Sequence, residues 1–379
     1  MAEPILTRYL YLLDETIYSL QQAMLTGSSF EECVHWVGEI YYSGFADKLW
    51  RFIFEFYYNF CAIIYPKYER KLTKLYQSST KDLLEKGCKK GLAQAPGNAS
   101  LEDILHAINI LFYGRKNLVV FSSHSLTPKI PEKIYIGRSP SWYKELVLET
   151  PSIKKYRNFV RSLHKRNSIN IAFYLKFYED HDELYEIVKC YFRKAHSMHL
   201  ADRSLDDIPY TDKAHIIMAV ILYLRQDPAD IYRKSVFRRY DHSAFVEQLA
   251  LSNKSVTPAY KTLPIQLQYP ISDKIGCFPL SRFSLKGMTV SELYWHHWEY
   301  YSYNSPIWRE RFDEYGAEID HPDRRIRFPT DDKYEEFSEK YYFETDEQTK
   351  TVQSRAIPNI SESSIAEWKV DIEGKLNQS

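Results

Sequence analysis

Apolar and aromatic residues recur at intervals of three and four along most of this chain, in runs bounded by capping residues, glycine or proline. The run "PILTRYLYLLDETIYSLQQAML" is soon followed by Gly27, which is typical of a left-handed helix C-cap. The next run, "SSFEECVHWVGEIYYSG", begins with Ser29 and Glu32 at capping-box spacing. Because this period matches α-helices and not strands, the sequence predicts a mainly α fold built of helical hairpins.

Two breaks in this period divide the chain. The short runs "NLVVF" and "KIYIG" are rich in β-branched and aromatic residues and predict a hairpin or extended connection. Farther on, "SVTPAYKTLPIQLQYPISDKIGCFPLSRF" carries prolines and little periodicity, and "RRIRF" resembles a strand. The predicted regions are an N-terminal helical region (1–114), a β or extended joint (115–140), a second helical region (141–250), a Pro-rich segment with an aromatic C-terminal corner (251–344) and a mobile polar tail (345–379).

The most apolar windows do not predict a membrane span. "LWRFIFEFYYNFCAIIYP" is interrupted by Arg51, Glu55 and Asn59 before Pro66, so we expect a buried helix from about Phe45 to Tyr65. The N-terminus carries no basic region ahead of its apolar residues, unlike a signal peptide. The chain is therefore expected to be cytoplasmic, neither secreted nor transmembrane.

The charge balance and the cysteines limit the classes of partner. Fifty Lys and Arg residues offset fifty Asp and Glu residues, so no global field attracts nucleic acid or an anionic membrane, and such binding needs a local patch. The five cysteines are odd in number and never form a C-x-x-C pair. This pattern argues against a disulfide framework or a structural zinc site and favours a reducing compartment.

The aromatic stretch "SELYWHHWEYYSYNSPIWRERF" raises the possibility of a metal site. On a helix, Glu292, His296 and Glu299 share one face, but His297 lies about 100 degrees away around the axis. No partner motif supplies further ligands, so we predict a solvated polar stripe there and no metal.

Packing explains the second half of this stretch. Ser305 suits an N-cap, Pro306 suits the first helical position, and Gly316 ends the helix. The run "SSIAEWKVDIE" in the tail predicts a short helix that docks on a partner. Large aromatic residues dominate protein interfaces. The predicted protein-contacting residues are Trp308, Phe312, Tyr315 and Trp368.

A basic ridge is the most specific charge pattern. Between residues 151 and 166 the chain carries six Lys and Arg residues and no acidic one. Lys154, Arg157, Arg161 and Lys165 fall on one side of a helical wheel, within about 80 degrees. The apolar residues Ile153, Tyr156, Val160 and Leu163 form a separate stripe. A second basic cluster comprises Arg233, Lys234, Arg238 and Arg239.

Two interpretations of these cations remain open. Phosphate backbones would suit them, because each neutralised phosphate releases counterions. Alternatively, the ridge faces the acidic segments 179–186 or 331–347, and the neutral total charge favours such intramolecular or protein–protein pairing.

Recognised enzyme motifs are missing. The chain contains no G-x-G-x-x-G, G-x-x-x-x-G-K-[ST], G-x-S-x-G, H-E-x-x-H or kinase signature. We therefore predict a non-enzymatic protein, with no catalytic residue and no cofactor.

Three segments, "HWVGEIYYSGF", "SPIWRERFDEYG" and "DEQTKTVQSRAI", resemble an uncharacterised protein family of nucleocytoplasmic large DNA viruses. The resemblance spans about residues 29–357 and implies a viral product in the host cytoplasm or virus factory, without a site residue to carry over. The leading hypothesis is an interaction scaffold or assembly subunit with protein partners. The alternative is a nucleic-acid-binding accessory factor in viral transcription or replication that uses the Lys154–Lys165 helix.

Overall fold

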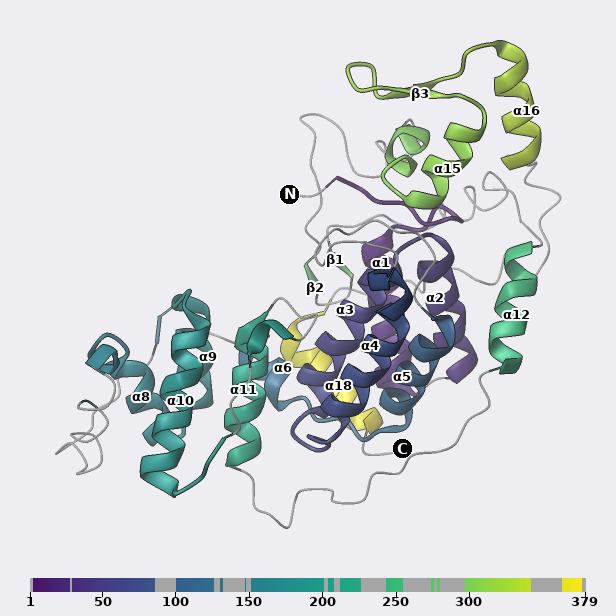
Figure 1. Cartoon of the computed structure of the whole chain (residues 1–379). Helices are drawn as coiled ribbons and strands as arrows, with labels where there is room; N and C mark the ends of the chain where they lie inside the picture. Colours follow the sequence, from purple (N-terminus) through teal and green to yellow (C-terminus); the bar gives the residue numbers. More distant parts are fainter. Residues whose placement is uncertain are drawn as a thin grey trace. The chain divides into compact units, whose positions relative to one another are not determined.

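The structure is a computed structural model that describes residues 3–27, 29–85, 100–125, 130–131, 147, 151–200, 204–207, 212–225, 243–254, 274–275, 278–279, 297–341 and 363–376 (Figure 1). It is mainly α-helical, as the sequence predicts. Contacts divide the chain into two compact units. Unit 1 comprises Met1–Phe52, Lys74–Tyr113 and Phe237–Ser379, and unit 2 comprises Ile53–Thr73 and Gly114–Val236.

Unit 1 is built on a helical hairpin whose caps follow the sequence prediction. α1 (Leu13–Thr26) ends at Gly27, which adopts a left-handed conformation, and α2 (Phe30–Tyr42) begins at Ser29, whose hydroxyl accepts from the Glu32 backbone N–H at 3.1 Å. α1 and α2 pack on each other and on α5 (Leu101–Tyr113). α12 (Ser243–Lys254) covers α2 and α5, while α3 (Ala46–Phe56) and α4 (Tyr68–Glu85) contain the unit boundaries.

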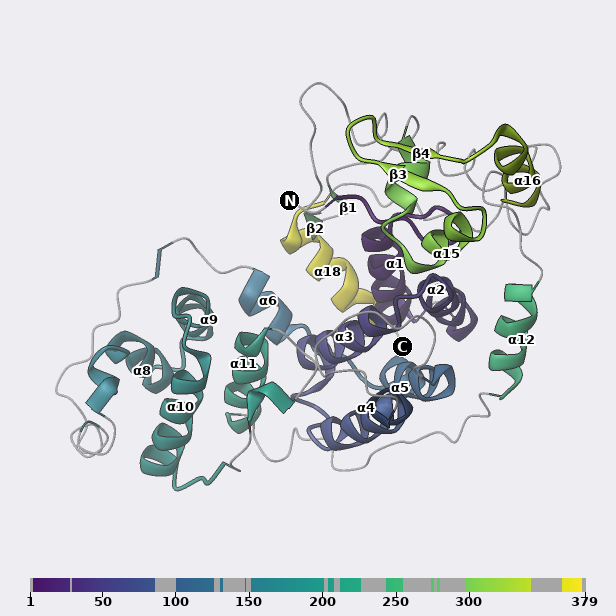
Figure 2. The same cartoon turned by 45° about the horizontal axis from the view of Figure 1, so that its top comes forward.

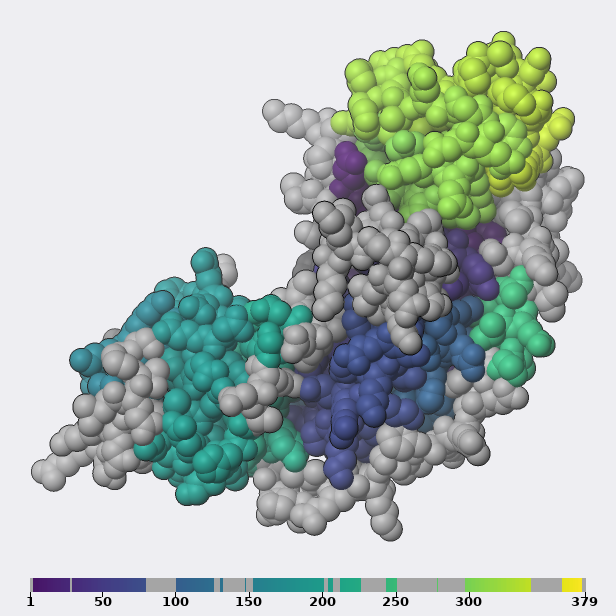
Figure 3. All heavy atoms as spheres, in the orientation of Figure 1, coloured from purple at the N-terminus to yellow at the C-terminus, as the bar shows by residue number. Residues whose placement is uncertain are grey.

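Residues 297–341 form a separate module of unit 1, the C-terminal module. A helical turn at 297–302 leads into α15 (Pro306–Glu314), an antiparallel hairpin of β3 (Glu318–Asp320) and β4 (Arg325–Arg327), and α16 (Asp331–Tyr341) (Figure 2). Its atoms form one continuous green body in Figure 3. The buried core of this module also includes residues of the N-terminal segment, so the start of the chain and the C-terminal module share one core. Its buried members are Leu6, Leu10, Leu12, Trp298, Tyr300, Tyr301, Trp308, Phe312, Ile326, Phe337 and Tyr341.

Unit 2 is a group of short helices. Its elements are a π-helix η1 (Tyr57–Cys61), α6 (Val119–Ser125), a 3-10 turn η2 (Pro151–Lys154), α8 (Arg157–His164), α9 (Ser168–Phe177), α10 (His181–His196), a 3-10 turn η3 (Leu205–Asp207) and α11 (Lys213–Leu224). α9 packs against α6, α8 and α11, and α10 packs against α11.

One local prediction for unit 2 is wrong, and another is confirmed only in part. The run "NLVVF" is not extended, because α6 begins within it: Asn117 Oδ1 accepts from the Val119 backbone N–H at 2.8 Å, and Val120 is buried. Tertiary packing thus overrides β propensity. The predicted Phe45–Tyr65 helix changes to a π-helix at Tyr57, whose wider turn leaves the Phe60 carbonyl oxygen to accept from Asn117 N at 2.7 Å.

The C-terminal residues also differ from the predicted mobile tail. Residues 342–362 lie outside the described residues, but α18 (Ile365–Leu376) is a helix that packs on α1 of the same chain. In the Pro-rich segment, the described residues form one short antiparallel pair, β1 (Lys274–Ile275) with β2 (Phe278–Pro279).

Candidate functional site

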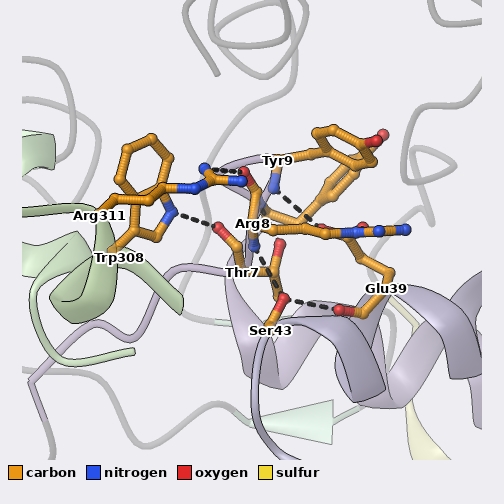
Figure 4. Close-up of polar contacts among 8 residues, drawn as sticks. Thr7, Arg8, Tyr9, Glu39, Ser43, Trp308 and Arg311 are labelled. Carbon is orange, nitrogen blue, oxygen red and sulfur yellow. Dashed lines mark hydrogen bonds and ion pairs between the residues drawn. The ribbon is translucent and has the colours of Figure 1, made fainter. Parts of the chain in front are cut away.

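A buried polar cluster joins the first residues of the chain to α2 (Figure 4). Arg8 Nε lies 2.8 Å from Glu39 Oε2, and the Tyr9 backbone N–H donates to the other carboxylate oxygen at 3.0 Å. Ser43 Oγ accepts from the Arg8 backbone N–H at 2.8 Å and donates to the Glu39 carbonyl oxygen at 2.6 Å. Arg8 is 5% exposed and Glu39 0%, so protein encloses this ion pair.

α15 contributes a second arginine to this cluster (Figure 4). Trp308 Nε1 donates to the Thr7 carbonyl oxygen at 2.9 Å, and Arg311 Nη1 lies 3.4 Å from the Arg8 carbonyl oxygen. The Arg311 guanidinium also lies over the rings of Trp308 and Tyr341, 4.5 and 4.8 Å from their centroids. Burial lowers the pKa of Arg311 to about 10. The cluster thus contains two cations and one carboxylate.

The role of the cluster is structural. Its hydrogen bonds fix the backbone of residues 7–9 between α2 and α15, and its charged side chains are shielded from solvent. A substrate cannot reach these groups while the fold is intact. We therefore assign the cluster to holding the C-terminal module on the N-terminal segment.

The residues predicted to contact a protein partner lie mostly in cores. Trp308 and Phe312 are fully buried, and Trp368 is packed edge-on against Phe278 with ring centroids 5.2 Å apart. Tyr315 is half-buried against Phe337. These positions correct the prediction of Trp308, Phe312 and Trp368 as contact residues: α18 docks on this chain, and the aromatic corner packs as a core.

The basic ridge of Lys154, Arg157, Arg161 and Lys165 lies on the solvent side of η2 and α8. Lys154, Arg157 and Lys165 are exposed and Arg161 is half-buried. The predicted apolar stripe, Ile153, Tyr156, Val160 and Leu163, is at most 1% exposed. The helical period therefore separates the two faces as expected, although a 3-10 turn replaces the first part of the predicted helix.

The described carboxylates of unit 2 do not pair with the four members of this ridge. Lys155, next to the ridge, lies 4.0 Å from Glu183, whereas Lys154, Arg157, Arg161 and Lys165 form no ion pair with the described residues of unit 2. Arg161 instead contacts the Asn158 amide oxygen at 3.5 Å. An acidic residue of α10 thus pairs with Lys155, which is next to the ridge, and not with the four ridge cations. This arrangement argues against the predicted pairing of the ridge with residues 179–186.

Aromatic rings line the helix beside the ridge. α9 packs against α8 (Figures 1 and 2). Tyr178, at the end of α9, donates from its hydroxyl to the Lys155 carbonyl oxygen at 3.2 Å. Next to it on α9, the rings of Phe173 and Phe177 are stacked with centroids 5.9 Å apart. Phe177 is 65% exposed, which is unusual for so large an apolar side chain.

Sequence reasoning missed the aromatic part of this face. The spacing of Phe173 and Phe177 at i and i+4 was available, but it is equally typical of a buried stripe. The second basic cluster, Arg233, Lys234, Arg238 and Arg239, lies outside the described residues, as do Glu292 and His296. His297 is described, and its Nδ1 lies 3.2 Å from the Arg324 carbonyl oxygen.

The described part of the chain offers little for other chemistry. It holds no group of three or more His, Cys, Asp or Glu side chains arranged to bind a metal. None of its helices combines the length and the apolar character that crossing a membrane requires. No protein-family model matches the chain, and no curated protein or solved structure matches it significantly.

Proposed function

We propose that unit 2 binds single-stranded nucleic acid on the face formed by α8 and α9. The observation that carries the proposal is the basic ridge: three of its four cations are exposed, Arg161 is half-buried, and none of the four has a carboxylate partner among the described residues of unit 2. Cations held in this way are available to phosphates, and each contact gains free energy by counterion release.

The aromatic row of Phe173 and Phe177 favours a single strand over a duplex. Proteins that bind single strands combine a basic track for the backbone with exposed rings on which bases stack. The exposed ring of Phe177 lies on the helix that packs against the ridge helix. In a duplex the bases are already stacked, so this ring would contribute little.

Binding of a fluorescent oligonucleotide, followed by anisotropy across a salt series, tests the proposal. If each ridge cation meets one phosphate, the slope of log Kobs against log salt concentration is about −2.8, and Arg157→Gln with Arg161→Gln reduces it to about −1.4. Phe177→Ala weakens binding by about 1–3 kcal/mol without changing the slope.

A matched control removes the same charge elsewhere. Lys333→Gln with Lys375→Gln changes two partly exposed cations of unit 1 and leaves binding and slope as in the unaltered protein. Equal losses from the ridge pair and the control pair, or tighter binding of duplex than of single strand, would overturn the proposal. Circular dichroism of each variant verifies that it is folded.

A further inference from the structure

A second group of cations gathers where three helices of unit 2 end. α8, α10 and α11 have their C-termini at His164, His196 and Leu224. Arg225, which follows α11, donates from Nη2 to the Leu163 carbonyl oxygen at 2.6 Å, so the end of α11 reaches the end of α8. Arg166 lies just beyond the end of α8, in a left-handed conformation with φ 56°.

The end of α10 adds an imidazole to this group. His196 Nε2 lies 3.3 Å from the Tyr191 hydroxyl. Burial lowers the pKa of His196, and the nearby charges of Arg166 and Arg225 lower it further. The Arg166 backbone N–H donates to the same Leu163 carbonyl oxygen as Arg225, at 3.2 Å, so the residues that follow α8 and α11 meet at this point.

The cations have no acidic partner among the described residues. Arg225 is largely buried, which lowers its pKa to about 10, and the charge of Arg166 acts in the same direction. The only hydrogen bond from the Arg225 guanidinium to the described residues goes to the Leu163 carbonyl oxygen, although a guanidinium carries five N–H donors. Arg166 and His196 are exposed, so a ligand in solvent can reach them.

Helix dipoles do not account for all of this charge. A helix C-terminus carries about half a negative charge, so three of them offset about one and a half positive charges. Arg166 and Arg225 supply two full charges even without Lys165 of the ridge, and the last turns of α8, α10 and α11 contain no acidic residue. The excess is positive and consists of donors, which is the chemistry that binds a phosphate dianion.

We propose that Arg166, Arg225 and His196 form a subsite for a phosphate monoester or inorganic phosphate, separate from the basic ridge. The two guanidinium groups donate hydrogen bonds to the phosphate oxygens, and His196 closes the third side. This subsite does not depend on nucleic-acid binding by the ridge. Its phosphate is either that of a free small molecule or the terminal phosphate of a strand held on the α8–α9 face.

Calorimetric titration of the whole protein with inorganic phosphate, at ionic strength held constant with sodium chloride, tests the subsite. Arg166→Asn removes the charge while keeping a residue that tolerates the left-handed conformation, and weakens phosphate binding about tenfold, the loss expected for one charged hydrogen bond. Lys375→Gln, on an exposed cation of unit 1, leaves phosphate affinity unchanged. Absence of saturable binding, or equal losses from the two variants, would overturn the subsite.

Oligonucleotides with and without a 5′-phosphate distinguish the two sources. A preference for the phosphorylated strand that Arg166→Asn abolishes assigns the subsite to strand ends. Saturable binding of inorganic phosphate without such a preference assigns it to a free phosphate compound. Failure of the ridge proposal is recognised separately, because oligonucleotide binding is then insensitive to Arg157→Gln while phosphate binding still responds to Arg166→Asn.

Discussion

Replacing Glu39 with Gln removes the only carboxylate from the buried cluster of Figure 4. The change keeps the shape and one acceptor oxygen, but it leaves Arg8 and Arg311 as buried like charges. Breaking one side of a buried ion pair costs about 3–5 kcal/mol, because the remaining charge stays desolvated. Glu39 is fully buried and bonded to both Arg8 and the Tyr9 backbone, so we expect the upper half of this range.

Urea titration followed by tryptophan fluorescence measures this loss. Six of the seven tryptophans belong to unit 1, all except Trp142, so the signal reports the unit that contains the cluster. Glu335→Gln, on an exposed position of α16, is the control and changes the free energy of unfolding by less than about 0.5 kcal/mol. A loss below about 1 kcal/mol for Glu39→Gln would show that water or another anion neutralises the arginines.

A double variant strengthens the argument. Arg8→Met combined with Glu39→Gln removes both charges of the pair, so the destabilisation should be smaller than the sum of the two single changes by about 1–3 kcal/mol. Additive losses would mean that the two side chains act independently, in conflict with their 2.8 Å contact.

Two further predictions concern single positions. Gly44 has φ 90°, and a Cβ there would lie 2.6 Å from Pro306 Cβ, whereas a Cβ on Gly27 (φ 62°) meets nothing within 4 Å. Gly27→Ala costs about 1–2 kcal/mol for the left-handed conformation alone, and Gly44→Ala destabilises unit 1 by more than that. Equal losses in tryptophan-monitored urea titrations would contradict the contact with Pro306. Burial lowers the pKa of His124 to about 2, and the neighbouring His215 and Lys176 act in the same direction. The unfolded chain therefore binds a proton at this position more readily than the folded chain does. The contribution of His124 to the free energy of unfolding is fully present above about pH 6.5 and falls by about 1.4 kcal/mol per pH unit below it. The stability difference between the unaltered protein and His124→Gln should shrink by about that amount from pH 6 to pH 5 in urea titrations followed by circular dichroism.

The features that the sequence predicts best depend on neighbours within a few residues. Gly27, Ser29 and Gly316 mark helix ends as expected, because a cap needs only the backbone of its own turn. The run "NLVVF" instead makes a contact with a distant part of the chain, because its Asn117 backbone N–H donates to the carbonyl oxygen of Phe60. Trp308 is the extreme case: its indole bonds to Thr7, 301 residues away along the chain, and nothing in the local pattern distinguishes such a buried tryptophan from an exposed one.

For the same reason, the sequence predicts the position of the ridge cations but not their tertiary neighbours. A helical period separates Lys154, Arg157, Arg161 and Lys165 from the apolar stripe, so the ridge could be drawn from the sequence alone. Whether those cations are already neutralised depends on which tertiary neighbours reach them. Among the described residues of unit 2, Glu183 of α10 pairs with Lys155 and with none of the four ridge cations. The spacing of residues in the sequence does not predict this choice of partner.

The neutral total charge of the chain consequently says little about this surface. Salt screens exposed charges over about 8 Å at physiological ionic strength, so a phosphate approaching α8 responds to the side chains within roughly that distance. Among the described residues of unit 2, no carboxylate forms an ion pair with Lys154, Arg157, Arg161 or Lys165. The balance of fifty acidic and fifty basic residues over the whole chain does not describe the charge around these four side chains. A zero net charge is therefore compatible with strong local attraction of polyanions, and the salt dependence of binding measures that attraction directly.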